Sequence, residues 1–301
     1  MMIFRAFVLC MIFQLFSVSC ASDAVTAEEY FTLGMAFFEI GRYPEAEYWL
    51  TRARTADRTM VASEYNLGRI AFETGRYDDA LRNFQSVLGR DPDNVMVLRA
   101  AAFTCIRLGN FTQAENYYSR LLGIVPDSAD NGFNHALVLY AMERYRDSEA
   151  VLLKFPDALN DDPNALLLLA RVQNAGNNIE AIDSYARWIS GNPADPNVIY
   201  EYAQVLEKHE LFALALEQYR ECLALLLQDQ EKLRRSNLRF KIARVIFIAD
   251  PGNDEAIAEL NMAIELGFND IEALEALSVD TRIDDNQRFL LREHIFNLRA
   301  L

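Results

Sequence analysis

The chain has 301 residues, enough for two ordinary domains or one long array of repeats. Its formal net charge of −15 argues against a nucleic-acid-binding protein, which needs a basic face, and gives no attraction to anionic lipid. Because 51% of the residues are hydrophobic and only 12 are glycine, no long disordered stretch is expected.

Residues 1–20 have the features of an export signal peptide. Arg5 gives a positive start, and residues 6–18 form a nearly unbroken apolar run that is too short to span a bilayer as a helix. Residues 17–20 resemble a bacterial lipobox, with Cys20 as the lipidated first residue of the mature protein, although Ser17 stands where leucine is usual. Ordinary cleavage after Ala21 is the alternative. The first site predicts a membrane-anchored lipoprotein facing the periplasm, and the second predicts a soluble periplasmic protein.

Residues 64–84 have the pattern of two short helices separated by a break. Leu67, Gly68 and Ala71 share one face of the first helix. Gly75 stands where a glycine usually ends a helix, and Asp78 follows where the start of the next helix favours negative charge. The small residues lie where two paired helices must approach closely, so the stretch predicts a helical hairpin.

The same landmarks recur at an interval of 34 residues. They are the glycines Gly41, Gly75 and Gly109, the alanines Ala46, Ala80 and Ala114, and the aromatic residues Tyr43, Tyr77 and Phe111. Leu33-Gly34, Leu67-Gly68 and Ala101-Ala102 follow the same interval. Several independent landmarks that keep one period indicate a repeat protein.

This period and residue pattern resemble the tetratricopeptide repeat over most of the chain. The resemblance implies an all-α fold, a right-handed α-α superhelix of about seven helical hairpins with capping helices at the C-terminal end. It also implies a protein or peptide partner and neither a cofactor nor a metal.

The repeats divide the chain after the signal peptide into five parts. These are units 1–3 at 27–128, a degenerate unit 4 at 129–161, units 5–6 at 162–236, unit 7 at 237–270, and capping helices at 271–301. Pro156 is expected to interrupt the second helix of unit 4. The second helix of unit 6 is expected to continue toward Arg235, and polar residues are expected on the outer face of the capping helices.

The first helix of each unit is expected to line the concave side of the superhelix with its second face. The predicted partner-binding residues on this side are Phe31, Met35, Phe38, Tyr65, Arg69, Phe72, Arg99, Phe103, Ile106, Phe133, Leu137 and Tyr140. An aromatic groove of this kind can receive an amphipathic helix or an extended peptide. The alternative is that some of these side chains only pack between neighbouring first helices. Toward the C-terminus the same positions become polar, with Gln204 and Glu207.

No catalytic or metal-binding pattern is present in the sequence. His135, His209 and His294 lie in different units, and none has a second ligand at metal-binding spacing. Acidic pairs fall where helices begin, which helix capping explains. Phosphate-binding loops, nucleophile elbows and dinucleotide fingerprints are absent, so no enzyme and no catalytic residue are predicted.

These observations predict an exported, lipid-anchored scaffold that mediates protein–protein interaction in the bacterial cell envelope. Two alternatives stay open: an accessory subunit of an envelope assembly, secretion or solute-uptake machine, and a carrier of an apolar small molecule in the aromatic half of the groove.

Overall fold

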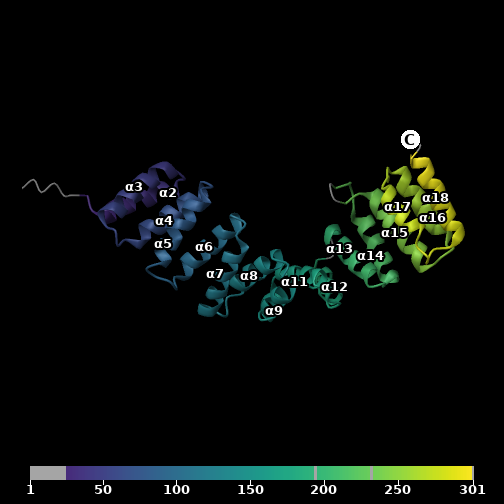
Figure 1. Ribbon diagram of the computed structural model, residues 1–301, viewed down its shortest axis with the longest axis horizontal. Helices are drawn as coiled ribbons and strands as arrows, with labels where there is room; N and C mark the ends of the chain where they lie inside the picture. The colour runs from purple at the N-terminus through teal and green to yellow at the C-terminus, as the bar shows by residue number, and fades with distance from the viewer. Residues whose placement is uncertain (1–24, 193–194, 231–232, 300–301) are drawn as a thin grey trace, which may run out of the picture. The chain divides into compact units, whose positions relative to one another are not determined.

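A computed structural model describes residues 25–192, 195–230 and 233–299 (Figure 1). The described residues form helices and connecting turns, with no strand among them. The predicted signal peptide, including Cys20, lies outside the described residues. The chain divides into two compact units, Met1–Pro126 and Asp127–Leu301.

The N-terminal unit contains three pairs of helices, in which each first helix packs against the second helix that follows it. In chain order the helices are α2 (Ala27–Glu39), α3 (Tyr43–Ala56), α4 (Val61–Glu73), α5 (Tyr77–Leu88), α6 (Val95–Arg107) and α7 (Phe111–Ile124).

The C-terminal unit continues the pairing, with one additional short helix, α10. Its helices are α8 (Ala129–Ala141), α9 (Tyr145–Leu152), α10 (Pro156–Asp161), α11 (Pro163–Ala175), α12 (Ala181–Gly191), α13 (Pro196–Lys208), α14 (Phe212–Leu225), α15 (Arg235–Ala249), α16 (Asp254–Glu265), α17 (Ile271–Ser278) and α18 (Asp285–Arg299). The division into seven repeat units remains a proposal from the sequence.

The turns inside the hairpins share one backbone conformation. Gly41, Gly75 and Gly109 have φ values of 73°, 75° and 71°, in the left-handed region that glycine adopts without strain. Glu143 takes the same conformation in the hairpin of α8 and α9, with φ of 59°. In the hairpin of α11 and α12 the left-handed residue is Asn177, which follows Gly176. The hairpin geometry therefore persists after the glycine is lost, because the packed helices on either side fix the turn.

Close helix approach explains the glycines inside the first helices. A Cβ atom on Gly68 would lie 2.6 Å from Cε1 of Phe84, and one on Gly34 would lie 2.7 Å from Cγ of Leu50. Each glycine thus leaves room for a large side chain of the second helix. In the third hairpin Ala102 is fully buried at the corresponding position.

Substitution of Ala80 by leucine is expected to destabilise the N-terminal unit by about 1–3 kcal/mol through overpacking. Ala80 is 0% exposed on α5, so the added atoms have no free space to enter. Thermal and urea unfolding followed by circular dichroism measure the change. The control is Ser86→Leu at an exposed position of the same helix, which is expected to stay within about 0.5 kcal/mol. Equal stability of Ala80→Leu and wild type would contradict the pairing of α4 with α5.

The fourth hairpin is interrupted where the sequence predicts it. α9 ends at Leu152, and Pro156 begins the separate helix α10. The ring of Phe155, between them, lies over Gly132: a Cβ atom on this glycine would be 2.1 Å from Cε2 of Phe155. The missing side chain on α8 therefore admits the aromatic ring that ends the hairpin.

The prediction that the second helix of unit 6 continues toward Arg235 is wrong. α14 ends at Leu225, and residues 226–230 and 233–234 are not helical. Leu226 and Leu233 are buried in the hydrophobic core instead of lying on the surface of a longer helix. The guanidinium of Arg235 donates to the carbonyl oxygen of Leu226 at 2.8 Å and so satisfies an acceptor freed by the helix end.

Two further expectations about exposure need correction. Leu33 lies 34 residues before Leu67 and is expected by this period on the same inward face, but it is 39% exposed, since no described helix precedes α2 to cover it. The outer face of α18 is not only polar: Arg292 and Glu293 are exposed, but so are Phe289 and Phe296.

The two cysteines within the described ranges, Cys105 and Cys222, are buried. Burial raises the pKa of Cys105 to about 11 and that of Cys222 to about 12, so both thiols stay protonated at neutral pH and are poor nucleophiles. Among the helices that the structure describes, none combines the length and the apolar character needed to cross a bilayer.

Candidate functional site

The candidate site in the N-terminal unit begins with Arg69 on α4. Its guanidinium carbon lies 4.4 Å from the ring centroid of Phe38 and 5.9 Å from that of Tyr65, which places the cation among aromatic rings. Its Nη1 donates to Oδ1 of Asn66 at 3.0 Å. The side chain is therefore held in one position and links α2 to α4.

Phe72 and Phe103 join α4 to α6. Their ring centroids are 5.5 Å apart with planes tilted by 40°. Phe72 also contacts Tyr77, at a centroid distance of 5.3 Å. Phe103 is 46% exposed although it is large and apolar, which makes it the most accessible ring of this group.

A pocket of about 180 Å³ lies among these side chains. It is lined by Tyr65, Arg69, Phe72, Glu73, Phe84, Ala100 and Phe103. Four of these residues are predicted from the sequence: Tyr65, Arg69, Phe72 and Phe103. The pocket is smaller than those that usually enclose a small-molecule ligand, and it suits one large apolar side chain of a partner.

The sequence prediction missed three lining residues, of which Phe84 is the largest. It lies on the second helix α5, in the core, and its ring reaches Tyr65 at a centroid distance of 5.8 Å. The signal was available in Gly68, because a glycine on a first helix allows a ring from the second helix to pass beneath it. Glu73 and Ala100 carry no comparable signal.

The remaining predicted residues of the N-terminal unit do not line this pocket. Phe31, Met35 and Phe38 are partly buried against the core residues Ala46, Leu50, Leu67 and Ile70. These contacts are consistent with the alternative of packing between helices, and the role of the three residues in partner binding stays a prediction. Arg99 is exposed, and its charge partly opposes the rise in the pKa of Tyr118 that burial causes. Ile106 is half-buried.

In the C-terminal unit, one of the three predicted residues lines a pocket. Tyr140 borders a pocket of about 250 Å³ together with Arg171, Asn174, Ala175, Tyr185, Glu201 and Gln204. Leu137 is 38% exposed and Phe133 is half-buried, and neither contributes to this pocket's lining.

A salt bridge gives this second pocket its polar character. Arg171 donates from Nε and Nη2 to the two carboxylate oxygens of Glu201, at 2.9 and 2.8 Å. Tyr185 donates its hydroxyl to the same carboxylate at 3.1 Å. Burial first, and then the Glu201 charge, raise the pKa of Tyr185, so it remains a neutral donor. The ion pair is thus oriented by a third group.

Glu207 lies on α13, six residues after Glu201, and takes part in a separate network of polar side chains. It is 8% exposed and accepts from the hydroxyl of Tyr219 at 2.8 Å and from Nε of Arg244 at 2.7 Å. Burial lowers the pKa of Lys241, while the Glu207 charge opposes this shift. The acid of α13 is therefore compensated by neighbours and holds α13, α14 and α15 together.

The side chains of the two pockets are suited to binding a partner through aromatic, arginine and carboxylate groups. No cluster of three or more His, Cys, Asp or Glu within the described ranges could hold a metal ion. Aromatic rings with a fixed arginine suit the anchoring of a peptide or a helix in the N-terminal unit, and the Arg171–Glu201 pair suits polar recognition in the C-terminal unit.

Comparison with known proteins shows what part of the chain and its fold are similar to. Residues 71–132 match the family model of the tetratricopeptide repeat. A curated relative, an uncharacterized lipoprotein of Treponema pallidum (strain Nichols), is 22% identical over 151 residues, which are 50% of this chain and 77% of the relative.

Solved structures with the same fold cover larger parts of the chain. A tetratricopeptide repeat protein from Parabacteroides merdae ATCC 43184 is 21% identical, with a TM-score of 0.56, over 83% of this chain and 97% of its own. YrrB, described as a tetratricopeptide repeat protein with an unusual peptide-binding site, is 16% identical, with a TM-score of 0.53, over 59% and 92%. PilW, a type IV pilus biogenesis factor, is 17% identical, with a TM-score of 0.52, over 69% and 96%. The predicted fold class, an all-helical tetratricopeptide repeat solenoid, is confirmed.

Proposed function

Since the chain carries tetratricopeptide repeats on an all-helical fold, we propose that it is an exported, lipid-anchored scaffold of the bacterial cell envelope that binds a partner peptide or helix through its first helices. The observation that carries this proposal is the pocket at Tyr65, Arg69, Phe72 and Phe103, which combines aromatic walls, a fixed arginine and an exposed ring. Tetratricopeptide repeats in general bind protein or peptide partners.

The chemistry of this pocket favours an apolar anchor residue on the partner. Aromatic and arginine side chains supply much of the binding energy in protein interfaces, most of all where a pocket excludes water around them. Arg69 is already stacked and hydrogen-bonded, so little side-chain entropy is lost when a partner binds. The proposal includes the other predicted residues of the first helices as surrounding contacts.

Capture of partners from crosslinked cell envelopes tests the binding function. The tagged full-length protein and a Phe103→Ala variant are compared. A protein recovered with the wild type and depleted with the variant supports the proposal. Recovery of the same proteins in the same amounts with both would move the binding site away from this pocket.

The lipid anchor rests on Cys20 and on the curated lipoprotein relative. Substitution Cys20→Ser is expected to move the protein from the membrane fraction to the soluble fraction, because the acyl chains are its only proposed tether. Cell fractionation and mass spectrometry of the mature N-terminus measure this. A wild-type protein that begins at Ser22 and is soluble would contradict lipidation and would support the alternative cleavage after Ala21.

An accessory role in an envelope machine is a narrower form of the same proposal. The structural similarity to PilW, named as a pilus biogenesis factor, favours it, although that similarity lies in the fold alone. A carrier of an apolar small molecule is the alternative from another class. Organic extraction of the purified protein followed by mass spectrometry separates the two, and recovery of a stoichiometric lipid would favour the carrier.

A further inference from the structure

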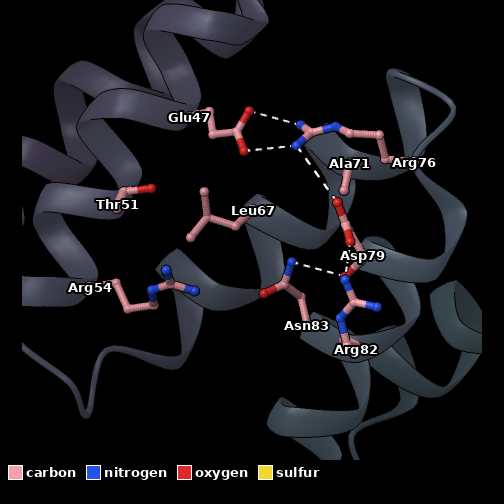
Figure 2. Close-up of a pocket in the computed structure, with 9 residues that line it drawn as sticks. All are labelled: Glu47, Thr51, Arg54, Leu67, Ala71, Arg76, Asp79, Arg82 and Asn83. Atoms are coloured by element: carbon pink, nitrogen blue, oxygen red, sulfur yellow. Dashed lines mark hydrogen bonds and ion pairs between the residues drawn. The ribbon is translucent and has the colours of Figure 1, made fainter.

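A further pocket, called the Arg54 pocket below, lies in the N-terminal unit between the second helices α3 and α5. Its volume is about 240 Å³. Leu67 and Ala71 of α4 are buried beneath it, and polar side chains of α3 and α5 border it on both sides (Figure 2). None of its lining residues contributes to the aromatic pocket described above.

Two of its three arginines are already neutralised. Arg76 donates to both carboxylate oxygens of Glu47, at 3.0 and 2.8 Å, and lies 3.9 Å from Asp79. Arg82 pairs with Asp79. Both carboxylates of the pocket are therefore engaged by arginines, Arg76 just before α5 and Arg82 within it (Figure 2).

Arg54 is the arginine without a carboxylate. It lies on α3, is half-buried, and forms no ion pair or hydrogen bond with the part of the chain that the structure describes. Figure 2 shows its guanidinium within the pocket, on the side that faces Asn83 of α5. The Arg54 guanidinium has no carboxylate partner among the described residues, although the chain carries a net charge of −15. It is therefore available to bind the anionic group of a ligand.

The neighbouring polar groups define what kind of anion fits. The hydroxyl of Thr51 is available as a donor one helical turn before Arg54 on α3. The amide nitrogen of Asn83 donates to the backbone oxygen of Asp79 at 3.1 Å, so its oxygen is left as an acceptor and points toward the side of Arg54 (Figure 2). A carboxylate flanked by a backbone N–H satisfies all three groups.

We propose that this pocket binds an aspartate or glutamate side chain of a peptide, with the carboxylate on the Arg54 guanidinium and the Thr51 hydroxyl and an adjacent peptide N–H on the Asn83 oxygen. A planar guanidinium takes a carboxylate through two parallel hydrogen bonds, which a small pocket with an apolar base strengthens. This site is separate from the aromatic pocket, and neither depends on the other.

The test uses the capped tripeptide acetyl-Gly-Asp-Gly-amide and its neutral counterpart with Asn, each titrated into the mature protein. Arginine side-chain NMR signals report the binding. The Asp peptide is expected to shift the Arg54 signal to saturation, and the Asn peptide is expected to bind about tenfold or more weakly, because it lacks the charge that the guanidinium recognises.

Two variants separate recognition by Arg54 from general charge. Arg54→Gln is expected to weaken binding of the Asp peptide about tenfold or more, and Arg54→Lys is expected to fall between, since it keeps the charge but loses the fork. Arg58→Gln removes the same charge at an exposed position near the end of α3 and is expected to leave binding unchanged. Phe103→Ala is likewise expected to have no effect on this peptide.

Three results would overturn the proposal: no saturable shift with the Asp peptide, equal binding of the Asp and Asn peptides, or equal loss in Arg54→Gln and Arg58→Gln. Saturation by inorganic phosphate without saturation by the Asp peptide would also overturn it and would assign the pocket to phosphate. Since Phe103 is not involved, failure here leaves the aromatic pocket untouched.

Discussion

Phe84→Ala is expected to lower the free energy of unfolding of the N-terminal unit by about 3–5 kcal/mol. The ring is 1% exposed and occupies the space that Gly68 leaves on α4. No neighbouring side chain can fill this space, because Gly68 has none and the two helices are already in close contact. The substitution therefore leaves a cavity as well as removing buried apolar surface.

Urea unfolding followed by circular dichroism measures this effect. Gln85→Ala is the matched control, since Gln85 is the next residue on α5 and is exposed. It is expected to change the stability by no more than about 0.5 kcal/mol. A loss below about 1 kcal/mol for Phe84→Ala would mean that the ring does not fill the space beneath Gly68, and the packing described for α4 and α5 would be wrong.

The double substitution Phe72→Ala and Phe103→Ala is expected to weaken binding of the captured partner about 30-fold or more. Loss of a well-packed anchor at an interface costs about 2 kcal/mol or more, and tenfold in affinity corresponds to about 1.4 kcal/mol. These two rings contact each other across α4 and α6 and form one wall of the aromatic pocket. Phe103→Ala alone should account for a large part of the loss, because its ring is the exposed one.

Binding of the purified, identified partner by isothermal titration calorimetry measures this loss. Helicity by circular dichroism must be the same in wild type and variants, which separates lost contacts from lost structure. Ile124→Ala is the control: Ile124 is apolar and 39% exposed in the same unit, but it lies on the second helix α7. Full affinity of the Phe72 and Phe103 double variant would remove the aromatic pocket from the proposed interface.

The repeat architecture could be predicted because several landmarks carry independent physical requirements. Gly75 takes a left-handed turn without strain, and Gly68 permits close helix approach, and both recur with one period. The end of α14 could not be predicted in this way. Leu223 to Leu227 are apolar and helix-compatible, and only the tertiary structure decides that Leu226 enters the core and ends the helix.

The candidate site was predictable in part. Periodicity places Tyr65, Arg69, Phe72 and Phe103 on the same side of neighbouring first helices, and the structure brings them to one pocket. Periodicity cannot tell whether a side chain on that side is accessible. Phe31 and Met35 occupy equivalent positions but pack against the core.

The Arg54 pocket had no sequence signal at all. Arg54 and Asn83 are far apart along the chain and belong to no motif. They line the same pocket because α3, α4 and α5 pack together. Arg54 is singled out as the binding group because Arg76 and Arg82 are already paired with carboxylates. Such information exists only in the folded structure.

Partner binding through the first helices is tested in intact cells by site-specific photo-crosslinking, with a benzophenone amino acid placed at position 103 or, for comparison, at position 124. Binding through the aromatic pocket predicts that a partner protein is crosslinked from position 103, identified by mass spectrometry, and not from position 124. Crosslinking of the same partner from both positions with equal yield, or from position 124 alone, would contradict binding through the aromatic face of the first helices.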